Sequence, residues 1–150
     1  GDRASMIELG DQNARIVRRQ AELYGLSQKL VSARWVPYSA HDVLTLIERY
    51  PEKERANAPE VNKVLDDVAE QCTAAIDKDR VDTLILGCPP LQCLEEQIRQ
   101  RLDQAGYDEI QLICESPAAI ECAKAMVNLK LTQAPRAYPS DLLKAKPEFR

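Results

Sequence analysis

Residues 81–91 read VDTLILGCPPL, and this stretch decides the class of fold. The apolar run before Gly87 is short and nearly continuous, which is typical of a parallel strand buried on both faces. Pro89 and Pro90 end the run, and residues 91–105 carry apolar side chains at helical spacing up to the next glycine. We therefore predict a buried strand that turns sharply into a helix.

The same alternation of strand and helix extends in both directions from this stretch. Further along the chain, a strand is predicted over 109–114, and Ser116-Pro117 opens a last helix that runs to about residue 129. Before it, the patterns predict a helix over 5–24, a strand over 31–36, a helix over 42–50, an exposed turn over 52–57 and a long helix from Pro59. Strands that alternate with helices indicate an α/β fold of three layers around a mostly parallel sheet.

The first strand of this pattern is apparently missing. The first predicted helix has no strand before it, and three strands make a thin sheet, so we expect another segment or another chain to complete it. An open sheet edge also favours pairing with a second copy, which predicts a homo-oligomer. The chain is expected to form one domain over residues 1–130, followed by an extended tail over 131–150, where prolines are frequent.

Composition and charge exclude several classes of partner. The formal net charge is −4, whereas nucleic acids and anionic membranes require a basic face. No apolar run approaches the ~20 residues that span a bilayer, and no signal peptide is visible, so a cytoplasmic protein is expected. One histidine and five cysteines without a CxxC pair lack the spacing of metal ligands, and no GxGxxG or phosphate loop is present. We therefore expect neither a metal nor a cofactor.

Cys88 is the candidate reactive group because it lies where the predicted strand turns into the helix. Ligands of open α/β folds bind at this carboxyl edge of the sheet, and Gly87 permits close approach to the backbone. The N-terminus of the following helix is predicted to lower the pKa of the thiol and to favour an anionic substrate. A thiolate can act as a general base or a nucleophile. The alternative is a buried cysteine that serves as a small hydrophobe.

The remaining candidate residues are expected to have structural roles and not catalytic ones. Cys93 follows in the same predicted helix and is expected to point in a different direction. His41 is expected to cap a helix or to lie in solvent, and Glu95 and Glu96 to form a solvated helix face. Three further cysteines are expected in the core: Cys72, Cys114 and Cys122.

Four segments, in order, resemble the second half of the aspartate/glutamate/hydantoin racemases. Residues 82–102, DTLILGCPPLQCLEEQIRQRL, are similar to the family's second cysteine motif, an apolar strand that ends in Leu-Gly-Cys before a helix. Residues 112–131, LICESPAAIECAKAMVNLKL, resemble the next strand, turn and alanine-rich helix. Residues 132–138, TQAPRAY, resemble the ending of the hydantoin and allantoin branch, and residues 15–36, RIVRRQAELYGLSQKLVSARWV, resemble the opening helix and strand of the second half.

The resemblance implies a flavodoxin-like half of a racemase fold and a cofactor-independent racemase or epimerase. Family members hold a hydantoin, an allantoin-like ureide or an amino acid between two halves, and each half offers one cysteine for proton transfer at the carbon alpha to a carbonyl. Cys88 would be the second-half cysteine, and Glu115 and Ser116 would border the pocket, unless Ser116 caps the last helix. The first-half cysteine motif has no counterpart in this sequence, so pairing with a missing N-terminal half is the alternative to a homo-oligomer.

Two prolines depart from the family pattern. Relatives carry Thr or Ala at the position of Pro89 and bind a carboxylate there, whereas Pro89 and Pro90 have no N–H to donate. The amides of Leu91 and Gln92 would then have to bind the anion. Two other functions stay open: a single-cysteine decarboxylase or isomerase of the same superfamily, and a non-catalytic member that binds a ligand or a partner protein.

Overall fold

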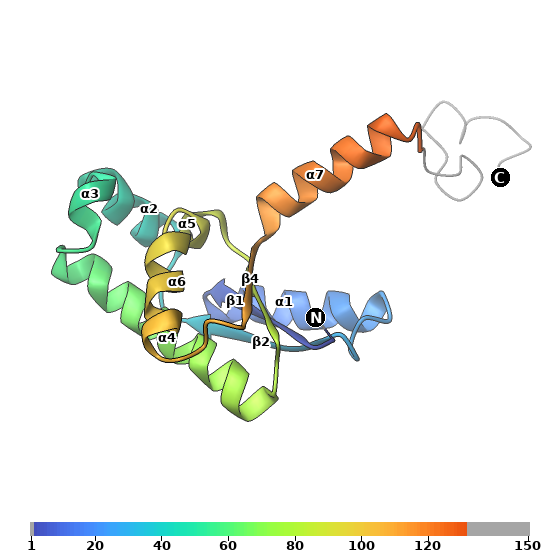
Figure 1. Ribbon diagram of the computed structural model, residues 1–150, viewed down its shortest axis with the longest axis horizontal. Coiled ribbons are helices and arrows are strands. Elements are labelled where there is room, and N and C mark those ends of the chain that lie inside the picture. The colour runs from blue at the N-terminus through green and yellow to red at the C-terminus, as the bar shows by residue number, and fades with distance from the viewer. Residues whose placement is uncertain (1, 132–150) are drawn as a thin grey trace, which may run out of the picture. The chain divides into compact units, whose positions relative to one another are not determined.

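The structure is a computed structural model that describes residues 2–131 of the chain (Figure 1). The chain falls into two compact units, Gly1–Ser116 and Pro117–Arg150. The first unit contains the sheet and the helices around it. The predicted tail over 131–150 lies outside the described residues except for Leu131.

A four-stranded sheet forms the centre of the first unit. Its strands run in the order β2-β1-β3-β4. Their bounds are β1 Ala4–Leu9, β2 Leu30–Val36, β3 Thr83–Leu86 and β4 Gln111–Cys114. Every neighbouring pair is parallel, and the strand order is that of flavodoxin-like doubly wound folds. The prediction of an α/β fold with a mostly parallel sheet is therefore confirmed.

The prediction that the first strand is missing is wrong, because residues 4–9 form β1 inside the sheet. Met6 lies opposite Ala33 of β2 on one side, and Ile7 lies opposite Leu86 of β3 on the other. Since β1 pairs with a strand on both sides, it is an inner strand of the sheet and needs no segment from elsewhere to take its place.

The sequence patterns did not predict β1, because two of its buried residues are polar. Ser5 is 0% exposed and Glu8 is 4% exposed, so the apolar pattern of a buried strand is interrupted twice. Gly10 follows with a φ of 76°, in the left-handed region that favours glycine, and it separates β1 from the first helix. The residues read from the sequence as one helix are therefore a strand, a glycine turn and a helix.

Helices connect the strands and extend beyond the last one. Their bounds are α1 Asp11–Leu23, α2 Ala40–Arg49, α3 Glu52–Arg55, α4 Pro59–Asp79, α5 Pro89–Gln92, α6 Glu95–Gln104 and α7 Glu115–Asn128. Ser39 and Asp42 form a capping box that starts α2, and Pro59 occupies the first turn of α4. The single helix predicted over 91–105 is two helices, because the chain turns between Gln92 and Glu95.

The helices of the first unit cover both faces of the sheet. Alternate residues of β1 point to opposite faces, so their contacts identify the helices on each side. Ile7 and Leu9 belong to a core cluster with Leu65 of α4, whereas Met6 and Glu8 line a cavity together with side chains of α1. Helices α2 and α6 pack against α4 and extend the helical layer to which α4 belongs. Full burial of each large aliphatic side chain in this core contributes roughly 1.5–3 kcal/mol. The three-layer prediction is confirmed.

An ion pair ties the edge strand β2 to the end of α4. Arg34 Nε and Nη2 donate to the two carboxylate oxygens of Asp79 at 2.7 and 3.0 Å. The side chains are 21% and 23% exposed, so water screens them only partly. The Arg34 hydrogen bond holds the pKa of Asp79 below its ordinary value. Because a carboxylate at a helix C-terminus is repelled by the helix dipole, Arg34 also offsets that repulsion.

We predict that Asp79→Asn lowers the free energy of unfolding at pH 7 by about 1–3 kcal/mol, because it leaves a half-buried guanidinium without its charged partner. The folded pKa of Asp79 is lowered, so this stabilisation is present above its ordinary pKa of 3.8 and is lost as the pH falls below that value. Urea denaturation at pH 7 and near pH 3 measures both effects. Asp66→Asn is the control, since Asp66 is 69% exposed beside Arg101 and should cost about 0–1 kcal/mol. Equal losses in the two variants would contradict the assignment.

Candidate active site

The carboxyl ends of three neighbouring strands bring Glu8, Cys88 and Glu115 to one edge of the sheet. Glu8 is the penultimate residue of β1, Cys88 follows β3 by one glycine, and Glu115 comes directly after β4. Parallel strands end at the same edge, where open α/β folds bind their ligands. The predicted positions of Cys88 and Glu115 are thus joined by a residue that was not predicted as part of the site.

Cys88 lies at the predicted corner between strand and helix, and it is also buried. It precedes the first residue of α5, with an extended backbone, and it is 7% exposed. It belongs to the same core cluster as Leu86 and Leu91. Both readings of this cysteine therefore hold in part, since the thiol lies at the edge of the sheet and also packs as a small apolar group.

The prediction that the following helix lowers the pKa of Cys88 is wrong. Burial and the neighbouring carboxyl groups of Glu8 and Glu115 raise the pKa of this thiol to about 11. The helix cannot oppose them, because α5 is only four residues long. Its amides are also occupied: Leu91 N and Gln92 N donate to the Cys88 carbonyl oxygen at 2.9 and 3.4 Å. Cys88 is therefore a protonated thiol at neutral pH.

The three residues after Cys88 do not provide the predicted anion site. Pro89 is exposed, whereas Pro90 and Leu91 are buried, and Leu91 is fully covered in the core. The prolines have no N–H, and the next two amides bond within the turn. This segment closes the core beneath Cys88 and offers a carboxylate no free backbone donor.

Glu8 is the group in the site that sequence reasoning missed. Burial and the charge of Glu115 raise its pKa from 4.5 to about 7, although a hydrogen bond from the Leu9 backbone opposes the change. A carboxyl group that titrates near neutrality at a sheet edge is suited to acid–base chemistry. The available signal was the lone acidic residue in the run Met6-Ile7-Glu8-Leu9, but this run was predicted as part of a helix and not as a strand.

Gly87 makes room for the Glu8 carboxyl group. A Cβ atom on residue 87 would lie 2.1 Å from Glu8 Oε1 and 2.8 Å from Met6 Cγ, which is closer than real atoms approach. The sequence predicted that Gly87 permits the close approach of a ligand to the backbone. In the structure, the group that approaches the Gly87 backbone is the Glu8 side chain.

A cavity of about 230 Å³ lies between the sheet and α1, and it carries two acidic groups. Its lining consists of Met6, Glu8, Val17, Gln20, Ala21, Tyr24, Leu26, Leu30 and Glu115. Burial also raises the pKa of Glu115. Two adjacent carboxyl groups repel an anion, but they accept hydrogen bonds from N–H donors. The walls are otherwise mainly apolar, as in small-molecule sites.

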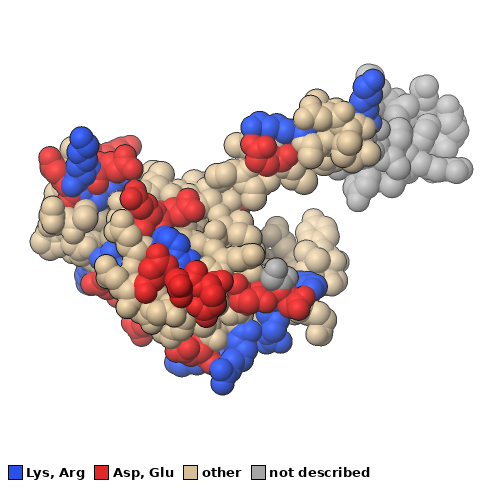
Figure 2. All heavy atoms as spheres, in the orientation of Figure 1, with Lys and Arg blue, Asp and Glu red and all other residues tan. Residues whose placement is uncertain are grey.

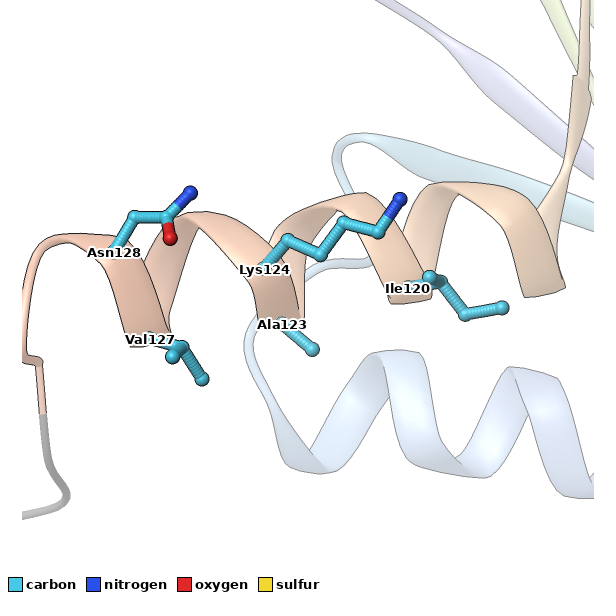
Figure 3. A pocket seen from close by; sticks show the side chains of 5 residues that line it. All are labelled: Ile120, Ala123, Lys124, Val127 and Asn128. Carbon is cyan, nitrogen blue, oxygen red and sulfur yellow. The ribbon is translucent and has the colours of Figure 1, made fainter.

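The start of α7 places Ser116 inside the helix and not before it. Since α7 begins at Glu115, Ser116 does not have the predicted capping position, and both residues are half-buried. In the second unit, Figure 3 shows Ile120, Ala123 and Val127 along one side of α7. The shallow hollow beside them includes no acid–base group except Lys124, so it offers no catalytic pair.

The structure confirms some of the predictions for the other cysteines and contradicts one of them. Cys72 and Cys114 are buried as predicted, but Cys122 is exposed and its predicted place in the core is wrong. Cys93 is exposed, in keeping with its expected direction. His41 is exposed in the first turn of α2, which Ser39 caps.

The described part of the chain, residues 2–131, contains no cluster of three or more side chains suited to hold a metal ion. In the same part, no helix has the length and apolar character to cross a membrane. Figure 2 shows acidic side chains gathered over α6 and the turn after it, with basic side chains dispersed between other elements. This face of the first unit lacks the continuous basic surface that nucleic acids require.

Comparison with known proteins adds a likeness of fold. No protein family and no curated protein matches the sequence. The structure is similar to the crystal structure of allantoin racemase from Pseudomonas fluorescens, with a TM-score of 0.67 and 23% sequence identity. The match covers 89% of this chain and 48% of that chain. The chain therefore has a racemase-like α/β fold and spans about half the length of this racemase.

Proposed function

We propose that this protein transfers protons at a carbon alpha to a carbonyl, as a cofactor-independent racemase or epimerase in which Cys88 is the acid–base group. The observation that carries the proposal is the convergence of the Cys88 thiol with two raised-pKa carboxyl groups, Glu8 and Glu115, at the carboxyl edge of the sheet. The racemase-like fold supports the class of reaction. The α-proton of such a substrate is weakly acidic, so it has to be moved by positioned groups.

The pKa values assign different roles to the thiol and the carboxyl group. Cys88 is protonated at neutral pH and is therefore ready to donate a proton to a carbanion or enolate. Glu8 ionises near pH 7 and is our candidate to accept the thiol proton when the reverse step requires a thiolate. Moving a proton between groups whose pKa values differ by about four units costs roughly 5 kcal/mol, which a catalysed step can include.

The acidic cavity favours a substrate that carries N–H groups and no net negative charge. Glu8 and Glu115 accept hydrogen bonds from ring or ureide N–H groups and repel a second carboxylate. The prolines after Cys88 leave no free amide for an anion. We therefore place hydantoins and allantoin-like ureides before aspartate or glutamate as substrates.

Racemisation also needs a proton-transferring group on the opposite face of the substrate. Among the described residues, Cys88 is the one cysteine that combines the edge position with two acidic neighbours. We propose that the second group comes from another copy of the chain or from a partner segment that corresponds to the other half of the racemase. The coverage of about half of the allantoin racemase chain supports this arrangement.

A single-thiol enzyme is the second candidate, and the raised pKa of Cys88 favours it. A thiol that stays protonated can supply a proton to an enediolate after carbon dioxide leaves, without ever acting as a base. Such a decarboxylase or isomerase would need no second cysteine. The racemase and the decarboxylase differ in products, since the first exchanges the α-proton with solvent and the second releases carbon dioxide.

We predict that Cys88→Ser lowers turnover by about 10²–10⁴-fold, because a serine hydroxyl is a far weaker acid than the thiol. Solvent deuterium incorporation at the α-carbon of allantoin or a 5-substituted hydantoin measures the racemase reaction, and carbon dioxide release from an arylmalonate measures the alternative. Cys93→Ser is the matched control and should keep full activity, since Cys93 is exposed. Full activity of Cys88→Ser in either assay would refute the assignment.

We predict that Glu8→Gln removes the rise of proton exchange between about pH 6 and 8, because the variant has no carboxyl group that ionises with a pKa of about 7. The same substitution is expected to raise the free energy of unfolding at neutral pH. The folded pKa of Glu8 is raised, so the stabilising contribution of this residue is fully present below pH 4.5. It is lost as the pH rises to about 7, which lowers the free energy of unfolding of the wild-type protein by up to about 3 kcal/mol.

Urea denaturation of both proteins from pH 4 to 8 tests the stability effect without any substrate. The difference between Glu8→Gln and wild type should grow across this interval in favour of the variant. Glu22→Gln, an exposed carboxylate on α1, is the control and should leave the curve unchanged. A pH-independent difference for Glu8→Gln would show that Glu8 titrates as an ordinary carboxylate.

A further inference from the structure

Arg55, the last residue of α3, is half-buried in an otherwise exposed helix. Its guanidinium donates three hydrogen bonds, and all three acceptors are backbone carbonyl oxygens. Nε donates to the Tyr50 oxygen at 3.1 Å, Nη2 to the Ile47 oxygen at 3.3 Å and Nη1 to the Cys93 oxygen at 3.4 Å. Among residues 2–131, no carboxylate forms an ion pair with this guanidinium, so Arg55 serves the backbone.

Two of the three acceptors lie at the C-terminus of α2. Tyr50 is the C-cap residue of this helix, and Ile47 belongs to its last turn. The amide that would normally bond to the Ile47 oxygen belongs to residue 51, which is a proline and has no N–H. The last carbonyl groups of a helix also carry the negative end of its dipole, which favours a cation. These two bonds alone would give Arg55 a structural role at the end of α2.

The third hydrogen bond reaches a different segment, the single turn of α5. Cys93 is the C-cap residue of α5, and Cys88 is its N-cap residue. The turn is held together from within, because Leu91 N donates to the Cys88 oxygen at 2.9 Å and Cys93 N donates to the Pro89 oxygen at 3.3 Å. In the described part of the chain, no other side-chain hydrogen bond joins this turn to another helix. Arg55 therefore joins the segment that begins at Cys88 to the end of α2.

The other attachments of α5 are to the sheet and to the core. Gln92 Nε2 donates to the Leu86 oxygen at the end of β3 at 3.3 Å. Leu91 is fully buried in the core cluster that also contains Val43 of α2, and α5 packs against α2. The turn that follows Cys88 is thus fixed to β3 by Gln92 and to α2 by Arg55.

We propose that Arg55 is a positioning residue for Cys88. By tying the end of α5 to the end of α2, its guanidinium keeps the turn against the core and keeps the Cys88 thiol at the carboxyl edge of the sheet. A lysine cannot replace it, because a single ammonium group lacks the planar set of donors that reaches three separate carbonyl oxygens. The effect on turnover rests on the proposed function, whereas the effect on the thiol itself does not.

The rate at which iodoacetamide alkylates Cys88, followed by peptide mass spectrometry, tests the positioning without any substrate. The background is Cys93→Ser, which keeps the backbone carbonyl that Arg55 binds. We expect Arg55→Lys and Arg55→Met to accelerate alkylation of Cys88 about tenfold or more, because losing a hydrogen bond from a charged donor shifts a local opening equilibrium by such a factor. Should Arg55→Met fail to fold, Arg55→Lys carries the test.

Arg99→Lys is the matched control for this measurement. Arg99 also donates to two backbone carbonyl oxygens, those of Tyr107 at 2.6 Å and Ile110 at 2.7 Å, but these lie in the turn before β4 and not in α5. The control should lower the thermal midpoint and leave the alkylation of Cys88 unchanged. An unchanged rate in both Arg55 variants, or an equal acceleration in Arg99→Lys, would overturn the proposal.

Proton exchange at the α-carbon of allantoin or a 5-substituted hydantoin tests the consequence for turnover. Per folded molecule, as measured by circular dichroism, Arg55→Lys should lower kcat by up to about a hundredfold, since a displacement on the order of 1 Å at a reacting group has such an effect. KM should change little, because Arg55 does not line the cavity. Arg99→Lys should keep the kcat of the wild type.

The two measurements together separate the two proposals. Faster alkylation of Cys88 in Arg55→Lys, in a protein whose wild type exchanges no proton, would contradict the proposed function and leave the role of Arg55 standing. An active wild type whose Arg55→Lys variant keeps its full kcat would refute the positioning role and leave the proposed function standing.

Discussion

The burial of one carboxyl group at the end of β1 is the constraint on which the candidate site depends. Glu8 is 4% exposed on an inner strand, and its carboxyl group occupies the space that a Cβ atom at position 87 would fill. Burying an unpaired charge is costly, so the group keeps its proton to a much higher pH than a carboxyl group in water. Glu115 increases this effect from the end of β4.

Burial, together with the charges of Glu8 and Glu115, decides the protonation state of Cys88. A thiol at the start of a longer helix, with free amides around it, would ionise easily. Here the thiol is buried, the helix has a single turn whose amides donate to the Cys88 carbonyl oxygen, and two carboxyl groups lie nearby. The site therefore holds protons at neutral pH, and the ionisation of Glu8 both destabilises the fold and prepares the base. A buried ionisable group of this kind is typical of sites where function opposes stability.

Sequence patterns predicted the parts of the fold in which apolar residues repeat without interruption. The strand before Gly87, the corner at Cys88 and the helix from Pro59 follow from such runs, and the resemblance to racemases pointed to the observed class of fold. The patterns failed where polar residues are buried. Ser5 and Glu8 concealed β1, and with it the principal acidic group of the site. The sequence also could not show that α5 is too short, and its amides too occupied, to lower the pKa of Cys88.

The central claim is that Glu8 is a buried carboxyl group that titrates near neutrality beside Cys88. Its most direct test is a titration of the Glu8 side-chain carboxyl carbon by ¹³C NMR, with the signal assigned by its absence from Glu8→Gln. We expect a midpoint of about pH 7. A midpoint near the ordinary value of 4.5 would mean that the carboxyl group lies in water, and it would contradict the account.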